Sequence, residues 1–202
     1  MNKIEIKSCD DDEKKIEIYF GEDLFRRIDQ SLFAKMDLYR FQHVSFEEFQ
    51  SLYIEREKKV ARLLAASFLA KKSFFVFELR EKLLLKGIGK EACDDAIAFY
   101  EDMGALSDQT KLSLLIEKEL RKGKSERAIR FFLRRYRIDQ ALIDQCFQTS
   151  GSSAKQSIES LLKGKLKKYS LQDPLQKRKV ILFLQRRGFS LNDIFAALKE
   201  EE

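Results

Sequence analysis

Proline, glycine and tryptophan are scarce in this sequence. Among 202 residues, proline occurs once, glycine 8 times and tryptophan not at all. A sandwich or barrel of many strands needs frequent turn residues, so this scarcity disfavours an all-β fold and favours helices. Hydrophobic residues make up 44% of the chain and include 17 phenylalanines, which supply the bulk for a buried core.

Histidine and cysteine are almost as rare, which limits the chemistry available to the chain. His43 is the single histidine, so a Ser–His–Asp arrangement could form only around it, in a segment that we expect to be a loop. The three cysteines lie far apart without a CxxC spacing, which predicts free thiols and no disulfide framework or zinc knuckle. The dinucleotide-binding, P-loop and HExxH motifs do not occur. We therefore expect no enzyme activity, no cofactor and no metal site.

Long apolar runs are missing as well. No stretch approaches the ~20 apolar residues that a membrane-spanning helix needs. The first residues, MNKIEIKSCDDDE, lack the apolar block of a signal peptide. Both absences predict a cytoplasmic protein, and free cysteines fit such a reducing compartment.

The N-terminal region, residues 1–44, alternates apolar and polar residues with a period of two. KIEIK and KKIEIYF flank the polar segment SCDDDE, a pattern that predicts a β-hairpin. Residues 24–28 form a candidate third strand, and we expect a short helix in the same region. The acidic run 10–13 could hold a hard cation, but a solvated hairpin tip is the favoured interpretation.

Helical signals begin at Ser45, where Glu48 three residues later completes a capping box. A connecting helix is predicted over residues 45–72, a stretch without glycine or proline. Ser73 is the expected N-cap of the next helix, which ends at Gly87. The further predicted helices are 89–103, 108–122, one beginning after Ser125, and 153–168.

Apolar positions recur along this helical part at an interval of 50 and then 51 residues, with Leu83, Leu133 and Leu184 equivalent. Four other sets share the spacing: Leu79, Ile129 and Val180; Ile88, Ile138 and Phe189; Cys93, Ile143 and Ile194; and Ile97, Phe147 and Leu198. Such periodicity predicts a mainly α fold built from tandem three-helix repeats, preceded by the small β region. The assigned repeats are 73–122, 123–173 and a truncated 174–202.

Positive charge is concentrated late in the chain. Residues 121–202 carry 19 Lys or Arg against 9 Asp or Glu, a net charge of +10, whereas residues 1–120 carry 20 against 24. The stretch GKSERAIRFFLRRYRID, residues 123–139, is especially basic. Wound as a helix, it predicts an apolar core face made of Ile129, Phe132, Leu133 and Tyr136. A stripe of arginines lies on another face and consists of Arg127, Arg130, Arg134 and Arg137. Phe131 and Arg135 lie beyond this stripe.

A solvated basic face is one interpretation of the stripe, and a contact surface for a polyanion or an acidic protein is the other. Only Glu126 lies near the stripe on this helix, so the arginines repel one another without much compensation. Arginine also suits bidentate contact with phosphate or carboxylate, and we therefore favour partner contact. The complete set of candidate contact residues is Arg127, Arg130, Arg134, Arg135, Arg137, Lys165, Lys168, Lys177, Arg178, Arg186 and Arg187.

The order of these elements resembles the RecX family, bacterial regulators of the RecA recombinase. The resemblance rests on a helix ending KLLLKGI, a second helix leading to MGALSD, and a third ending in RKGKSERAIRFFLRRYRI. It covers the two central repeats well and the last repeat recognisably. The chain departs from the family where Ser107 and Asp108 replace a common acidic pair, and where Arg137 replaces a glycine.

This resemblance implies an elongated, curved protein that lies in the groove of the RecA–DNA filament. It would modulate, and by expectation inhibit, recombination and ATPase activity, and so act in DNA repair and the SOS response. The implied partners are the RecA filament and DNA, both single-stranded and double-stranded. We expect no membrane contact, and we expect the chain to be a monomer. Two other classes stay open: a DNA-binding protein that acts without RecA, and a helical scaffold for another protein.

Overall fold

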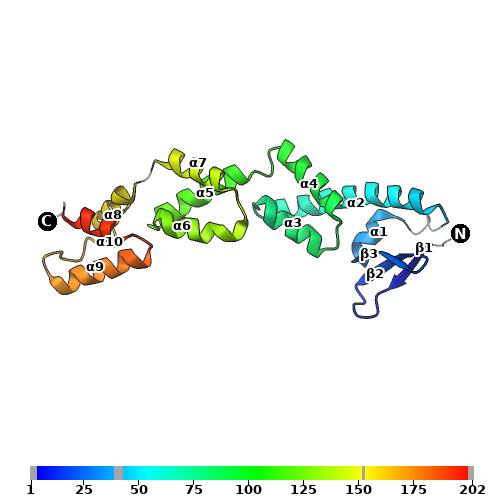
Figure 1. The fold of residues 1–202 in the computed structure, drawn as a ribbon, viewed down its shortest axis with the longest axis horizontal. Helices are drawn as coiled ribbons and strands as arrows, with labels where there is room; N and C mark the ends of the chain where they lie inside the picture. Colours follow the sequence, from blue (N-terminus) through cyan, green and yellow to red (C-terminus); the bar gives the residue numbers. More distant parts are fainter. Residues whose placement is uncertain (1–3, 39–42, 152, 200–202) are drawn as a thin grey trace. The chain divides into compact units, whose positions relative to one another are not determined.

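The structure is a computed structural model that describes residues 4–38, 43–151 and 153–199. The chain divides into two compact units, Met1–Ser107 and Asp108–Glu202 (Figure 1). Most of the described residues are helical, and a small antiparallel sheet lies near the N-terminus. The predicted mainly α fold class is confirmed.

The N-terminal sheet contains three described strands in the order β1–β2–β3. They are β1 (Ile4–Ser8), β2 (Lys15–Phe20) and β3 (Asp23–Asp29), and both pairings are antiparallel. Ile16 and Ile18 of β2 are buried, as the alternation with a period of two requires. The predicted hairpin is thus confirmed, and the candidate third strand is part of the sheet.

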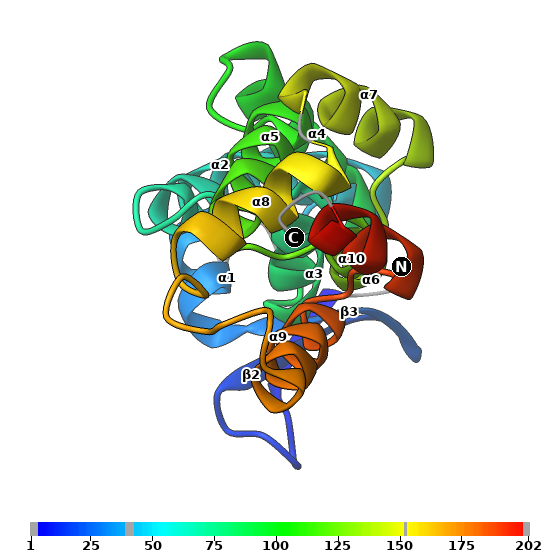
Figure 2. The same cartoon turned by 90° about the vertical axis from the view of Figure 1, so that its left-hand side faces the viewer.

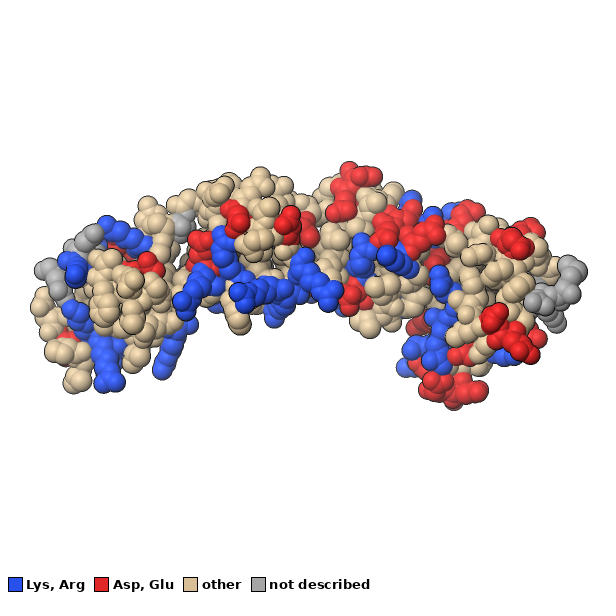
Figure 3. Space-filling view, in the orientation of Figure 1, with Lys and Arg blue, Asp and Glu red and all other residues tan. Residues whose placement is uncertain are grey.

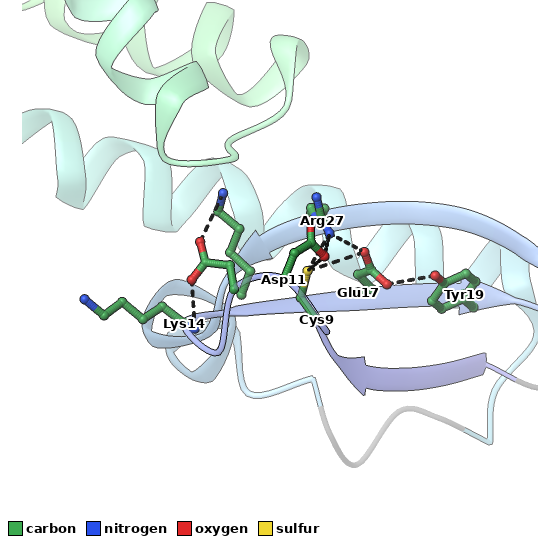
Figure 4. Close-up of polar contacts among 8 residues, drawn as sticks. Cys9, Asp11, Lys14, Glu17, Tyr19 and Arg27 are labelled. Carbon is green, nitrogen blue, oxygen red and sulfur yellow. Dashed lines mark hydrogen bonds and ion pairs between the residues drawn. The ribbon is translucent and has the colours of Figure 1, made fainter.

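The tip of the hairpin contains a polar cluster (Figure 4). The Arg27 guanidinium lies 2.7 Å from Asp11 Oδ1 and 3.0 Å from Glu17 Oε1, and it also contacts Cys9 Sγ. Glu17 in turn accepts a hydrogen bond from the Tyr19 hydroxyl at 2.8 Å. An arginine therefore compensates part of the local negative charge. Within the described residues, no group of His, Cys, Asp or Glu side chains has the arrangement of a metal site.

The helices of the first unit share one apolar core with the sheet. They are α1 (Gln30–Met36), α2 (Phe46–Leu69), α3 (Val76–Leu85) and α4 (Lys90–Asp102). The long helix α2 packs against the other three, and it contributes the fully buried Phe49 and Tyr53 to the core. The connecting helix predicted for residues 45–72 is therefore a central part of this unit.

The starts of these helices follow the capping predictions in one case and depart from them in another. Ser45 caps α2, and its side chain accepts a hydrogen bond from the Glu48 N–H at 3.2 Å. The predicted cap at Ser73 is wrong. Helix α3 begins two residues later, after Phe75, whose N–H donates to the Glu78 carboxylate at 3.0 Å. An acidic side chain thus satisfies an amide that a serine was expected to bind.

A buried carboxylate joins α2 to the start of α4. Glu57 is almost fully buried, and its Oε1 accepts hydrogen bonds from the Gly89 N–H at 2.8 Å and from the Tyr53 hydroxyl at 3.1 Å. Burial raises the pKa of Glu57 above its usual range. Gly89 has no side chain to cap α4, and a Cβ there would lie 2.9 Å from Glu57 Oε2. Glycine therefore leaves room for the carboxylate that caps the helix from outside.

Within the described residues, the regular elements of the second unit are all helical. They are α5 (Asp108–Arg121), α6 (Glu126–Leu133), the 3-10 turn η2 (Arg134–Tyr136), α7 (Gln140–Ser150), α8 (Ala154–Lys163), α9 (Pro174–Arg186) and α10 (Leu191–Lys199). Helix α5 packs against α6 and α7, and α10 packs against α8 and α9. Figure 2 shows α8 beside α10 with α9 beneath them.

The predicted repeat register is visible in burial. Leu83, Leu133 and Leu184 are each fully buried near the ends of α3, α6 and α9. The residues of three other predicted sets are also buried, whereas in the set that contains Ile138 that residue is only half-buried. Equivalent leucines thus anchor equivalent helices, as a repeat array requires.

Helix packing sets where each group of three helices begins. The first group combines α2 with α3 and α4, the second α5 with α6 and α7, and the third α8 with α9 and α10. Each group starts one helix earlier than the assigned repeats 73–122, 123–173 and 174–202, and the last group has three helices. A sequence period fixes the interval between repeats but leaves the starting helix undetermined.

The turn after the second helix of each group has a left-handed backbone in all three groups. Gly87, Arg137 and Gly188 have φ angles of 82°, 52° and 90°. Glycine adopts this conformation without steric cost, whereas a residue with a Cβ is strained there. Arg137 therefore occupies a position that the other two groups give to glycine.

The Arg137→Gly variant is expected to have a free energy of unfolding about 1 kcal/mol higher than that of the Arg137→Ala variant. Both substitutions remove the arginine side chain, but only alanine keeps a Cβ in the left-handed region. Urea unfolding of the two variants measures the difference. Equal midpoints at equal slopes would show that the turn is not held in this conformation.

Candidate interaction surface on the second unit

Helix α6 presents one buried face and one exposed face. Ser125 caps it by accepting a hydrogen bond from the Ala128 N–H at 3.2 Å, which fixes where the helix begins. Ile129 and Leu133 are fully buried, whereas Phe132 and Tyr136 are half-buried at the margin of the core. The predicted apolar face is thus confirmed at its centre, and the opposite face is open to solvent.

Two arginines of the predicted stripe, Arg127 and Arg134, are exposed and form no ion pair with any described residue. Arg127 borders a hollow of about 320 Å³ that Asp193 also lines, but the Asp193 carboxylate is bound to the Ser190 hydroxyl at 2.5 Å. The Arg134 guanidinium lies 5.6 Å from the centre of the Phe131 ring. Both cations are therefore available to an anionic partner.

Arg130 differs from these two, and the expectation that it is nearly unpaired is wrong. Its guanidinium lies 2.6 Å from Glu126 Oε1 and 2.5 Å from Asp144 Oδ1. It also lies 4.7 Å from the centre of the Phe147 ring. Asp144 and Phe147 belong to α7, so Arg130 holds α6 to its neighbouring helix.

The last two arginines of this stretch lie at and beyond the end of α6. The Arg135 guanidinium lies over the Phe132 ring at 4.1 Å and donates to the Tyr136 hydroxyl at 2.9 Å. Arg137 is exposed on the left-handed turn. Arg135 therefore covers the half-buried rings at the edge of the core while it remains exposed to solvent.

Arg187 joins the two groups of helices within the second unit. Its guanidinium donates to the Lys122 carbonyl oxygen and lies 4.5 Å from the centre of the Phe183 ring. Its own carbonyl oxygen accepts from the Ser125 N–H at 2.9 Å. Arg187 thus has a structural role within the unit, and its contact with a partner stays a prediction.

Gly188 brings the same two groups close together. A Cβ at Gly188 would lie 2.5 Å from Ser125 Oγ and 2.7 Å from Ala128 Cβ. The turn that follows α9 therefore packs directly on the first turn of α6. Because of this joint, Arg127 of α6 and Gly188 after α9 line the same hollow, and Arg186 is exposed at the end of α9.

The remaining predicted contact residues lie on α9 and on the turn after α8. Lys165 and Lys168 are exposed, but α8 ends at Lys163, so they lie on a turn beyond the helix that was predicted to extend to residue 168. Lys177 is half-buried and Arg178 is exposed on α9. In Figure 3, blue basic side chains gather over the part of the surface formed by α6 and α9.

Two features add to what the sequence indicated: the large exposure of Phe131, which was placed off the apolar face, and the contacts of Glu119, which was not singled out. Phe131 is 72% exposed, the largest exposed fraction of any large hydrophobic side chain on α6. Glu119 is buried, and its carboxylate lies 2.6 Å from both Lys122 Nζ and Lys124 Nζ. These two lysines lower the pKa of Glu119. Glu119 lies on α5, before the basic stretch, and the sequence alone did not pair it with these lysines.

Other predictions concern chemistry and membranes. His43 is exposed in a turn, and the preceding residues 39–42 of its predicted loop lie outside the described residues. Within the described part of the chain, no helix is long and apolar enough to cross a membrane. The cysteines Cys9, Cys93 and Cys146 are free and buried.

Comparisons with known proteins give a consistent result. The family model for the third three-helix domain of RecX matches residues 155–198, which cover α9 and all but one terminal residue of each of α8 and α10. The regulatory protein RecX of Vibrio vulnificus is 27% identical over 137 residues, which cover 68% of this chain and 90% of that protein. The regulatory protein RecX of Acinetobacter baylyi is 30% identical over 160 residues, which cover 78% of this chain and 98% of that protein.

Solved structures show the same fold. A crystal structure of regulatory protein RecX aligns with a TM-score of 0.60 at 14% identity and covers 99% of this chain and 100% of its own. RecX from Lactobacillus salivarius aligns with a TM-score of 0.58 at 16% identity and covers 71% and 96%. These structures support the helical repeat array. With a relative that is matched over nearly its whole length at 30% identity, the chain belongs to the RecX family.

Proposed function

We propose that this chain binds RecA–DNA filaments and lowers their recombinase and ATPase activities, so that it acts in recombination, DNA repair and the SOS response. Family membership supports the regulatory role, because the matched relatives are regulatory proteins named RecX. The resemblance seen in the sequence supplies RecA as the expected target. The chain would act where RecA–DNA filaments form, which we expect to be the cytoplasm.

The observation that carries the proposal is the unpaired positive charge on the second unit. Arg127 and Arg134 are exposed, have no ion pair with a described residue, and lie in a region with a net charge of +10. A filament of protein and DNA offers phosphates and acidic side chains, both of which arginine binds well. The remaining exposed candidates are Arg135, Arg137, Lys165, Lys168, Arg178 and Arg186.

The chain would regulate by occupying its target and not by catalysis. The sequence offers a single histidine, and that residue, His43, is exposed. Glu57 and Cys93 are buried inside the first unit, where they contact helix ends and core residues and are closed to a substrate. We therefore propose a monomeric, cofactor-free binding protein.

Co-sedimentation with preformed RecA–single-stranded DNA filaments, run beside naked DNA, tests the proposal. The chain should pellet with the filament and slow DNA-dependent ATP hydrolysis by RecA in proportion to the bound amount. Binding to naked DNA that is equally tight and steeply salt-dependent, with no effect of RecA, would favour a DNA-binding protein that acts alone. Failure to bind either target would favour a scaffold for another protein.

A further inference from the structure

Phe131 is an exposed aromatic ring in a basic surrounding. Its side chain is 72% exposed, although its neighbours Ile129 and Leu133 are fully buried. It lies four residues after Arg127 and three before Arg134, so helical geometry brings both arginines to the same side of α6. An exposed phenylalanine adds nothing to the core, so the core gives no reason for a ring at this position.

The arginines near Phe131 divide into engaged and available ones. Arg130 is bound to Glu126 and Asp144, and Arg135 lies against Phe132. Arg127 and Arg134 have no ion pair with a described residue. The Arg134 guanidinium lies 5.6 Å from the centre of the Phe131 ring, and the large exposed fraction leaves much of the ring uncovered.

We propose that Phe131 stacks on an unpaired base of single-stranded nucleic acid, while Arg127 and Arg134 bind the phosphates on either side of that base. Proteins that hold single strands combine cations along the backbone with aromatic rings under the bases. This inference depends on the proposed function in one respect, namely that the RecA filament supplies the DNA. It assigns the contact with the bases to a single side chain, Phe131.

The surroundings of Phe131 favour a base over an apolar protein pocket. A ring that inserts into a protein groove is usually the centre of an apolar patch. Phe131 is instead flanked by charged side chains, and within the described residues α6 has no other exposed large hydrophobic side chain. The faces of bases are accessible in single strands and covered in a duplex, so the contact also predicts a preference for single strands.

Fluorescence anisotropy without RecA tests this contact. The probes are labelled oligothymidine, an abasic strand of the same length, and a duplex of the same length. The proteins are the wild-type chain, Phe131→Ala, Phe131→Trp and the control Leu114→Ala, which removes a 61% exposed side chain from α5. Circular dichroism of each variant first confirms that it is folded.

The wild type should bind oligothymidine about 5-fold or more tightly than the abasic strand, because stacking on one base contributes that much. Phe131→Ala should lose this difference and leave duplex binding unchanged, while Phe131→Trp and Leu114→Ala should retain it. The inference is overturned if the wild type does not bind oligothymidine, if it binds the abasic strand equally, or if Phe131→Ala keeps the difference.

The filament assay separates this inference from the proposed function. Wild-type binding to RecA filaments without base-dependent binding to naked strands would leave the proposed function intact and remove the stacking contact. If Phe131→Ala lost filament binding without any change on oligothymidine, Phe131 would contact protein, and the nucleic-acid inference would be wrong. Base-dependent binding of single strands without binding to filaments would instead contradict the proposed function.

Discussion

Replacing Arg127 and Arg134 together with glutamate is expected to weaken binding to RecA–single-stranded DNA filaments about tenfold or more. Both side chains are exposed and have no ion pair with a described residue, so their charges are available to a partner. Reversal turns each attraction into a repulsion, which costs more than removal of the charge. Co-sedimentation over a salt series measures the loss. The variant should also show a shallower dependence on salt, because it has fewer attractive contacts to screen.

A matched variant controls for the change in net charge. Lys71→Glu with Lys90→Glu makes the same charge change on two exposed lysines of the first unit, outside the predicted contact set. This control should bind nearly as the wild type does. Circular dichroism should show that both variants are folded. If the two variants lose affinity equally, only the net charge matters, and if the Arg127 and Arg134 variant binds like the wild type, the filament contacts another face.

Leu133→Ala is expected to destabilise the chain by roughly 2–4 kcal/mol. Leu133 is fully buried at the end of α6, and its removal leaves a cavity as well as a loss of apolar burial. The equivalent Leu83 and Leu184 are also fully buried, so the position is central to each group of helices. Urea unfolding monitored by circular dichroism measures the loss.

Arg134→Ala is the neighbouring control for this substitution. Arg134 is exposed and contacts only the exposed ring of Phe131 among the contacts described, so its removal should change stability by no more than about 0.5 kcal/mol. Comparable losses in the two variants would mean that α6 is rotated about its axis, so that Leu133 does not face the core while Arg134 faces solvent.

The periodic signals of the sequence predicted the fold well, whereas the local capping signal at Ser73 did not. Alternation in β2 predicted the hairpin, and the spacing of Leu83, Leu133 and Leu184 predicted the repeat. The start of each group could not be read from the spacing, because the same interval fits any starting helix. Glu57 was not predicted either, since its role depends on the N–H of Gly89, which packing and not sequence proximity brings to it.

The candidate surface was predicted in outline and corrected in detail. Helical geometry alone placed Arg127 and Arg134 on the exposed side. It could not show that Asp144, from the next helix, pairs with Arg130, or that the Lys122 carbonyl binds Arg187. These partners meet the arginines only after tertiary packing, so the distinction between engaged and available cations is a property of the folded unit.

The joint between Ser125 and the Arg187–Gly188 turn also bears on the order of assembly during synthesis. The Ser125 N–H donates to the Arg187 carbonyl, and Gly188 packs on the first turn of α6. A nascent chain that has reached α7 lacks both groups, so the start of its α6 is still exposed to water. The helix that carries the arginines can therefore reach its final form only after α9 has left the ribosome, and a nascent chain that stops earlier would display those cations on an incompletely supported helix.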